Sequence, residues 1–121
     1  MDVLVVEDEA LVREIVAEGL SDDGLAVADA ATAEQALALA ETAGAPDVVV
    51  TDVELGRGMD GLALAGEVHR RWPGAGVVIM TGNPAAMNGH ALGEQERFLA
   101  KPFGNGRLVS AVRELMGRST R

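Results

Sequence analysis

The stretch Asp47–Leu55, which reads DVVVTDVEL, decides the fold. Its apolar run Val48–Thr51 is short, rich in Val, and ends directly on Asp52. Such runs, separated by stretches of helical periodicity, are typical of buried parallel strands. Three other runs have the same form and end on polar residues: Val3–Val6 before Glu7 and Asp8, Val77–Met80 before Thr81, and Phe98–Ala100 before Lys101. Ligands of open α/β sheets gather at the carboxyl ends of the strands, so we expect these polar side chains to meet at one edge.

Length and composition restrict the class of protein. The chain has 121 residues, which suits one domain, and 48% of them are hydrophobic, enough for a buried core. The absence of cysteine excludes disulfides and thiolate metal sites. The net charge of −9 disfavours nucleic acid and anionic membranes as partners. No apolar run approaches the ~20 residues of a membrane span, and the chain opens on an expected strand without a leader, so we expect a cytoplasmic protein.

The periodicity predicts five strands alternating with five helices. The strands are expected over residues 2–6, 25–28, 48–51, 77–80 and 97–100. The helices are expected from about residue 8 to 20, from the cap Thr32 to Gly44, from Gly61 to before Pro73, over 85–92, and over 105–116. In the first helix, Val12, Ile15, Val16 and Leu20 are expected to face the core. The helix over 85–92 is the weakest, because Asn88 and Gly89 are poor helix formers.

This alternation predicts an α/β fold with a parallel sheet covered by helices on both faces. Five strands in a chain of this length suit the flavodoxin-like, doubly wound order 2-1-3-4-5. The strand order then reverses between the first and third strands, which would place Glu7 and Asp8 beside Asp52. His69 and His90 are expected on the surface, away from the acids.

Three carboxylates would therefore gather at one sheet edge. They repel each other, so at least one should have a raised pKa unless a cation is present. Hard oxygen ligands suit Mg²⁺, which takes few protein ligands and keeps several waters. For Glu7 and Asp8, a solvated acidic loop is the alternative. Asp52 ends a run expected to be buried, where an unpaired charge is costly. A carboxylate at this position can attack phosphorus to give an aspartyl phosphate. The alternative role for Asp52 is a cap at the start of a loop.

Thr81 and Lys101 complete the expected site. The Thr81 hydroxyl can donate to a phosphate oxygen, and Gly82 after it lets the backbone approach closely. Lys101, the only lysine in the chain, can neutralise phosphoryl oxygens. The alternatives are an ordinary strand-end threonine and a surface lysine. Pro102 marks a fixed turn, in which a cis peptide bond can occur.

These residues resemble the receiver domain of two-component response regulators, over about residues 2–117, with residues 118–121 as a polar tail. The resemblance rests on five motifs in order, VLVVEDE, DVVVTDVEL, MDGLALA, VVIMTG and FLAKPF. It implies that Glu7 and Asp8 hold Mg²⁺ with Asp52 and the backbone carbonyl of Glu54. It further implies that Asp52 is the phosphoacceptor, that Thr81 and Phe98 are switch residues, that Lys101 contacts the phosphate, and that the Lys101–Pro102 bond is cis.

The resemblance also implies a role in signalling. The phosphoryl donor would be a sensor histidine kinase or a phosphotransfer protein, and the domain would catalyse only its own phosphorylation and dephosphorylation. A downstream protein would bind the face formed by the fourth helix, fifth strand and fifth helix, which bears Ala91, Leu92, Phe98 and Arg113. We expect a monomer or weak dimer, either a single-domain regulator or a domain of a hybrid kinase, without a DNA-binding output domain in this chain.

Two departures and two alternatives accompany this interpretation. Residues 54–58 read ELGRG where the family often has Met-Pro-Gly, so the Glu54 side chain adds a negative charge near an incoming phosphate. Phe98 lacks the hydroxyl of the tyrosine that many relatives carry. One alternative is a phosphatase resembling the haloacid dehalogenase superfamily, although its nucleophile would belong on the first strand. The other is a pseudo-receiver that serves only as a scaffold.

Overall fold

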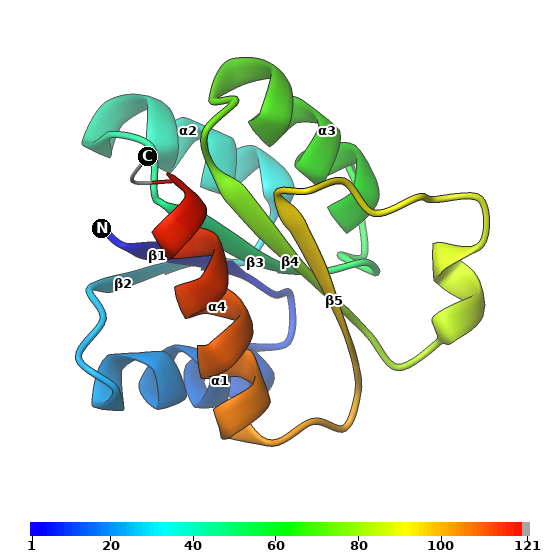
Figure 1. The fold of residues 1–121 in the computed structure, drawn as a ribbon. Helices are drawn as coiled ribbons and strands as arrows, with labels where there is room; N and C mark the ends of the chain where they lie inside the picture. Colours follow the sequence, from blue (N-terminus) through cyan, green and yellow to red (C-terminus); the bar gives the residue numbers. More distant parts are fainter. Residues whose placement is uncertain (120–121) are drawn as a thin grey trace.

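Five parallel strands form the centre of the computed structural model, which describes residues 1–119 (Figure 1). The strands are β1 (Val3–Val6), β2 (Val27–Ala30), β3 (Val48–Asp52), β4 (Gly76–Thr81) and β5 (Glu96–Ala100), in the order β2-β1-β3-β4-β5. The expected sheet order is therefore confirmed. The helical elements are α1 (Ala10–Asp22), α2 (Ala33–Ala43), α3 (Gly61–Arg71), the 3₁₀ turn η1 (Pro84–Met87) and α4 (Asn105–Ser119).

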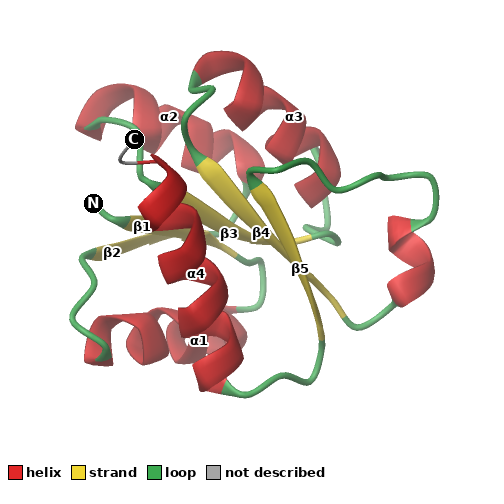
Figure 2. Cartoon of the chain, viewed as in Figure 1, coloured by secondary structure: helices red, strands yellow, loops and turns green. Residues whose placement is uncertain are grey.

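The helices cover both faces of the sheet, α1 and α4 on one and α2 and α3 on the other (Figure 2). Successive strand residues point to opposite faces, so Val3 and Val5 pack toward α1 and α4, while Leu4 and Val6 pack toward α2 and α3. Both faces of the central strands are thus buried, which explains why these runs are continuously apolar. No helix within residues 1–119 has the length and apolar character to cross a membrane.

The structure differs from the sequence-based expectations at Ile15 and in the position of β2. In α1, Val16 and Leu20 are buried, but Ile15 is 59% exposed, so its expected place in the core was wrong. Ile15 lies one turn after Leu11, which is 69% exposed, and the two share the solvent side of the helix. Strand β2 begins two residues later than expected, because its register pairs Val27 with Val3 at the start of β1.

The larger correction concerns the expected helix over residues 85–92. The described chain has four α-helices rather than five, and only the single 3₁₀ turn η1 lies between β4 and β5. None of the residues of η1 is buried. Gly89 has φ +84°, a left-handed conformation that stops a helix, and residues 88–95 continue as a loop. The fifth expected helix is therefore the one labelled α4. The described part of the tail ends at Ser119, and residues 120–121 lie outside the described residues.

Candidate functional site

The predicted polar residues meet at the carboxyl ends of β1, β3, β4 and β5. Asp8, Asp52 and Lys101 line an open cavity of about 500 Å³ there, while Glu7 and Thr81 are buried beside it. Its lining residues come from four connections: Asp8, Glu9, Asp52, Glu54, Gly56, Gly82, Asn83 and Lys101. Gly61 keeps the end of β3 close to α3, because a Cβ there would collide with the backbone carbonyl of Asp52. The sheet therefore gathers at one edge residues that lie far apart in the sequence, as strand order predicts.

Asp52 is the centre of this edge. It is 7% exposed, and its two carboxylate oxygens have different partners. Oδ2 accepts a hydrogen bond of 2.8 Å from Lys101 Nζ, and Oδ1 accepts one of 3.2 Å from the backbone N–H of Glu54. Burial alone would raise the pKa of Asp52, but the hydrogen bond and charge of Lys101 hold that pKa below its ordinary value. Asp52 is thus ionised at neutral pH, the form in which a carboxylate is a nucleophile.

Glu7 shares the same lysine but behaves differently. Its side chain is 1% exposed, and Oε1 lies 3.2 Å from Lys101 Nζ, a longer contact than the one to Asp52. Burial, together with the neighbouring Asp8 and Asp52, raises the pKa of Glu7 to about 7. One lysine therefore compensates the charge of Asp52 and only partly that of Glu7. Both carboxylates in turn raise the pKa of Lys101 against the opposing effect of its burial.

Thr81 and Glu54 form a contact that the sequence did not predict. Thr81 is fully buried, and its Oγ1 lies 3.2 Å from each carboxylate oxygen of Glu54. The same oxygen accepts a hydrogen bond of 3.0 Å from the backbone N–H of Asn83. The Glu54 side chain was expected only to add negative charge. In the structure, the Glu54 carboxylate contacts the Thr81 hydroxyl, which was expected to bind the phosphate.

The residues of this edge fit a hard divalent cation. Asp8 and Asp52 line the same cavity with carboxylate oxygens, the ligands that Mg²⁺ prefers. Within residues 1–119, no group of three or more His, Cys, Asp or Glu side chains is arranged to hold a metal ion by itself. Mg²⁺ needs few protein ligands and keeps several waters, so two carboxylates and a backbone carbonyl suffice. Burial is the largest cause of the raised pKa of Glu7, and the nearby charge of Asp52, which a cation would offset, adds to it.

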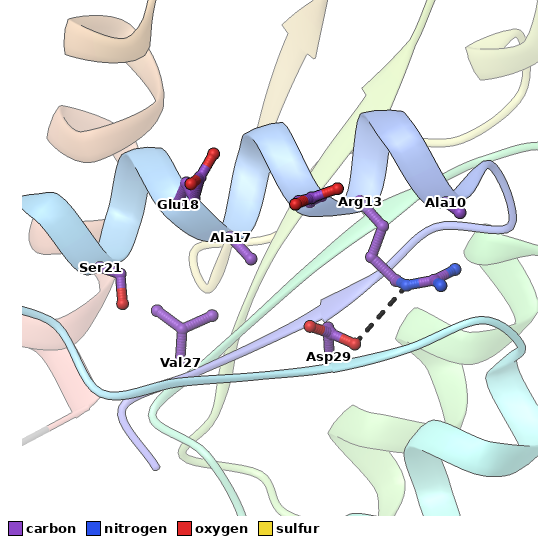
Figure 3. Close-up of a pocket in the computed structure, with 8 residues that line it drawn as sticks. Ala10, Arg13, Ala17, Glu18, Ser21, Val27 and Asp29 are labelled. Atoms are coloured by element: carbon purple, nitrogen blue, oxygen red, sulfur yellow. Dashed lines mark ion pairs between the residues drawn. The ribbon is translucent and has the colours of Figure 1, made fainter.

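Arg13 is a supporting residue that sequence reasoning missed. Its Nη1 donates a hydrogen bond of 2.8 Å to the backbone carbonyl of Glu7, and its Nε lies 3.5 Å from Asp29 Oδ1. Figure 3 shows this ion pair in a separate cavity of about 400 Å³ between α1 and β2. Arg13 thus ties α1 and β2 to the backbone that precedes Asp8. No pattern in the sequence distinguishes it from other helix-surface arginines.

The remaining predicted residues lie near β5. The Lys101–Pro102 peptide bond is cis. Phe98 is half-buried and lines a cavity of about 280 Å³ with Arg97 and Arg107. Arg113 does not join that surface as expected, because its guanidinium binds Asp23 at the end of α1, with Nη2 2.8 Å from Asp23 Oδ2.

The two histidines are less exposed than the sequence predicts. His69 and His90 are half-buried, and both contact the buried carboxylate of Glu96. They do lie outside the residues that line the Asp52 cavity, as expected.

The family model of the response regulator receiver domain matches residues 3–113. The chain belongs to this family, and it is therefore a receiver domain of the response regulators of two-component systems. This membership supports the receiver interpretation over the phosphatase alternative.

Individual relatives agree with the family. The transcriptional regulatory protein FixJ of Azorhizobium caulinodans is 37% identical over 125 residues, which cover 98% of this chain and 56% of FixJ. The chain thus spans about half the length of that relative. The crystal structure of the receiver domain of NtrX from Brucella abortus is 33% identical with a TM-score of 0.82, covering 96% of this chain and 98% of that one.

A third relative contains a ligand. The response regulator TrrA from Thermotoga maritima, solved in complex with Mg²⁺–BeF, is 28% identical with a TM-score of 0.82. The match covers 93% of this chain and 96% of TrrA.

Proposed function

We propose that this receiver domain accepts a phosphoryl group on Asp52 in a Mg²⁺-dependent reaction. The observation that carries the proposal is the 2.8 Å contact between Lys101 Nζ and Asp52 Oδ2 at the edge of an open cavity. Lys101 keeps Asp52 ionised, and its ammonium is available to neutralise phosphoryl oxygens in the transition state. The TrrA complex with Mg²⁺–BeF supports the same chemistry by similarity.

The proposed step transfers a phosphoryl group from a phosphohistidine. An oxygen of Asp52 attacks phosphorus, the new O–P bond forms as the P–N bond breaks, and the imidazole leaves with the bonding electrons. The Glu54 backbone N–H and Lys101 orient the carboxylate during the attack. The Thr81 hydroxyl then leaves the Glu54 carboxylate and donates to a phosphoryl oxygen. Hydrolysis by water later restores Asp52, so the domain acts only on its own phosphoryl group.

Mg²⁺ is the proposed cofactor of both reactions. When bound, the ion supplies positive charge that offsets the charge of the phosphoryl group. The residues proposed to hold it are Asp8, Asp52 and the backbone carbonyl of Glu54, and the buried Glu7 is proposed to add negative charge beside them.

A sensor histidine kinase or a phosphotransfer protein is the proposed donor. Its docking surface on this chain is the exposed apolar pair Leu11 and Ile15, which are 69% and 59% exposed. Leu11 lies three residues after Asp8, so a protein bound there reaches the cavity. Exposed apolar side chains beside a reactive site suit transient protein contacts.

The proposed output is a contact with a downstream protein. The surface formed by η1, β5 and α4 carries the half-buried Phe98, and the loop between η1 and β5 carries Leu92, which is 48% exposed. Movement of Thr81 toward a phosphoryl group would free space that Phe98 can fill, and this would change the surface.

A chemical trap tests the proposed site. The protein is treated with acetyl phosphate and Mg²⁺, and then reduced with borohydride, which converts an aspartyl phosphate to homoserine. We expect homoserine at position 52 after peptide mapping. Homoserine at another aspartate would contradict the assignment, and its absence throughout the chain would favour a pseudo-receiver.

A further inference from the structure

A buried carboxylate outside the Asp52 site joins three parts of the chain. Glu96 is the first residue of β5 and is 6% exposed. Its Oε1 accepts hydrogen bonds from His90 Nε2 at 3.1 Å and from the Gly93 backbone N–H at 3.0 Å. Its Oε2 lies 3.0 Å from His69 Nε2, on α3. A buried charge is costly unless it is hydrogen-bonded, and these donors supply the bonds.

Both histidines must carry a proton on Nε2 to hydrogen-bond to Glu96. An ionised carboxylate only accepts hydrogen bonds, so each imidazole must carry a proton on Nε2 to donate to it. The three donors hold the pKa of Glu96 below its ordinary value, although burial opposes them. Glu96 therefore remains an acceptor for both histidines at neutral pH.

The segment that these bonds hold has few other anchors. It runs from Pro84 to Gly93 and includes η1, which has no buried residue and extends away from the sheet (Figure 1). Ala86 and Met87 pack only partly against the core, and Leu92 is 48% exposed. A segment with so little buried apolar surface opens at low free-energy cost. The hydrogen bonds from His90 and Gly93 to Glu96 are thus important for holding this segment in place.

Space for movement lies beside the cluster. An open cavity of about 530 Å³ lies between α3 and the segment, and its lining includes Leu62, Gly66, His69 and His90. His90 can therefore leave Glu96 without displacing packed core residues, whereas His69 stays on a regular helix. In this cluster, the His90 hydrogen bond can break and re-form, and the His69 hydrogen bond stays in place.

We propose that Glu96 is a latch that holds residues 84–93 against α3 through His90, while His69 keeps the carboxylate in place. Breaking the His90 hydrogen bond releases the segment and leaves the rest of the fold unchanged. The latch does not depend on phosphorylation of Asp52, so it can be tested without it. Thr81 lies just before this segment in the sequence. Where Thr81 moves toward a phosphoryl group, as in the proposed function, the bonds to Glu96 set how easily residues 84–93 move with it.

Hydrogen exchange on the unphosphorylated protein tests the latch. We expect His90→Ala to speed amide exchange over residues 84–93 by roughly tenfold, the effect of losing one hydrogen bond to a charged group. Exchange in β1 and α1 should stay as in the wild type. Asn88→Ala, an exposed substitution in the same segment, is the matched control and should change little.

Two further variants keep the test decisive. His69→Ala should speed exchange over 84–93 by a smaller factor, because the His90 and Gly93 bonds to Oε1 remain. Glu96→Ala should speed exchange over 84–93 at least as much as His90→Ala, since it removes the acceptor oxygens of both histidines and of the Gly93 N–H. Equal exchange in His90→Ala and Asn88→Ala would overturn the latch. Exchange raised throughout the chain would also overturn it, because the cluster would then stabilise the whole fold rather than one segment.

Discussion

The hydroxyl of Thr81 lies 3.2 Å from both carboxylate oxygens of Glu54, so an acidic side chain contacts the hydroxyl that we propose binds a phosphoryl oxygen. A phosphoryl group on Asp52 and the Glu54 carboxylate cannot both bind this single hydroxyl. Glu54 is exposed and can swing out, but its contact with Thr81 favours the unphosphorylated arrangement.

Removing this competitor should raise phosphorylation. We expect Glu54→Ala to increase the ratio of phosphorylated to free protein in acetyl phosphate and Mg²⁺ by roughly two- to tenfold, the effect of one lost hydrogen bond. Glu54→Gln keeps an acceptor but not the charge and should give an intermediate ratio. Intact-mass spectra measure both. An unchanged or lower ratio in Glu54→Ala would show that Glu54 does not compete for Thr81.

Removing the lysine should destabilise the metal-free protein. Lys101 contacts both Glu7 and Asp52, so Lys101→Ala leaves two buried carboxylates without a cation. We expect the free energy of unfolding to fall by about 1–3 kcal/mol, less than for a fully buried pair because Lys101 is 28% exposed. Urea unfolding measures the loss, and Mg²⁺ should restore more stability in the variant than in the wild type. Equal stability of both proteins without Mg²⁺ would be incompatible with this charge balance.

Glu7 predicts an unusual dependence of stability on pH in the metal-free protein. Its pKa is about 7 in the folded state against an ordinary value of 4.5. Between these values the folded protein binds more protons than the unfolded chain, so this group makes stability fall as pH rises. We expect Glu7→Gln to match the wild type near about pH 4 and to exceed it by about 1–3 kcal/mol near about pH 8. A difference that does not change with pH would contradict the raised pKa.

The sheet and the meeting of the polar side chains at one of its edges could be predicted, because each depends on a local pattern. The runs before Asp52, Thr81 and Lys101 are continuously apolar, and strand order alone brings their ends together. The Glu54–Thr81 contact depends on side-chain rotation between residues 27 positions apart, and no periodicity records it.

Other misses have similar physical causes. The cluster of Glu96 with His69 and His90 needs a loop in place of a helix, and this loop was expected to be helical. Ile15 shows the limit of periodicity. Positions 12, 15 and 16 fit one helical stripe in the sequence, but Val12 and Val16 pack against the core while Ile15 is exposed.

The central claim is that Asp52 is the phosphoacceptor, and Asp52→Asn tests it most directly. The substitution removes the nucleophile and keeps the size of the side chain, while Asp22→Asn, at the exposed end of α1, is the matched control. Intact-mass spectra are recorded after treatment with acetyl phosphate and Mg²⁺. We predict one added phosphoryl group on the wild type and on Asp22→Asn, and none on a folded Asp52→Asn protein. Equal phosphorylation of Asp52→Asn and the wild type would contradict the claim.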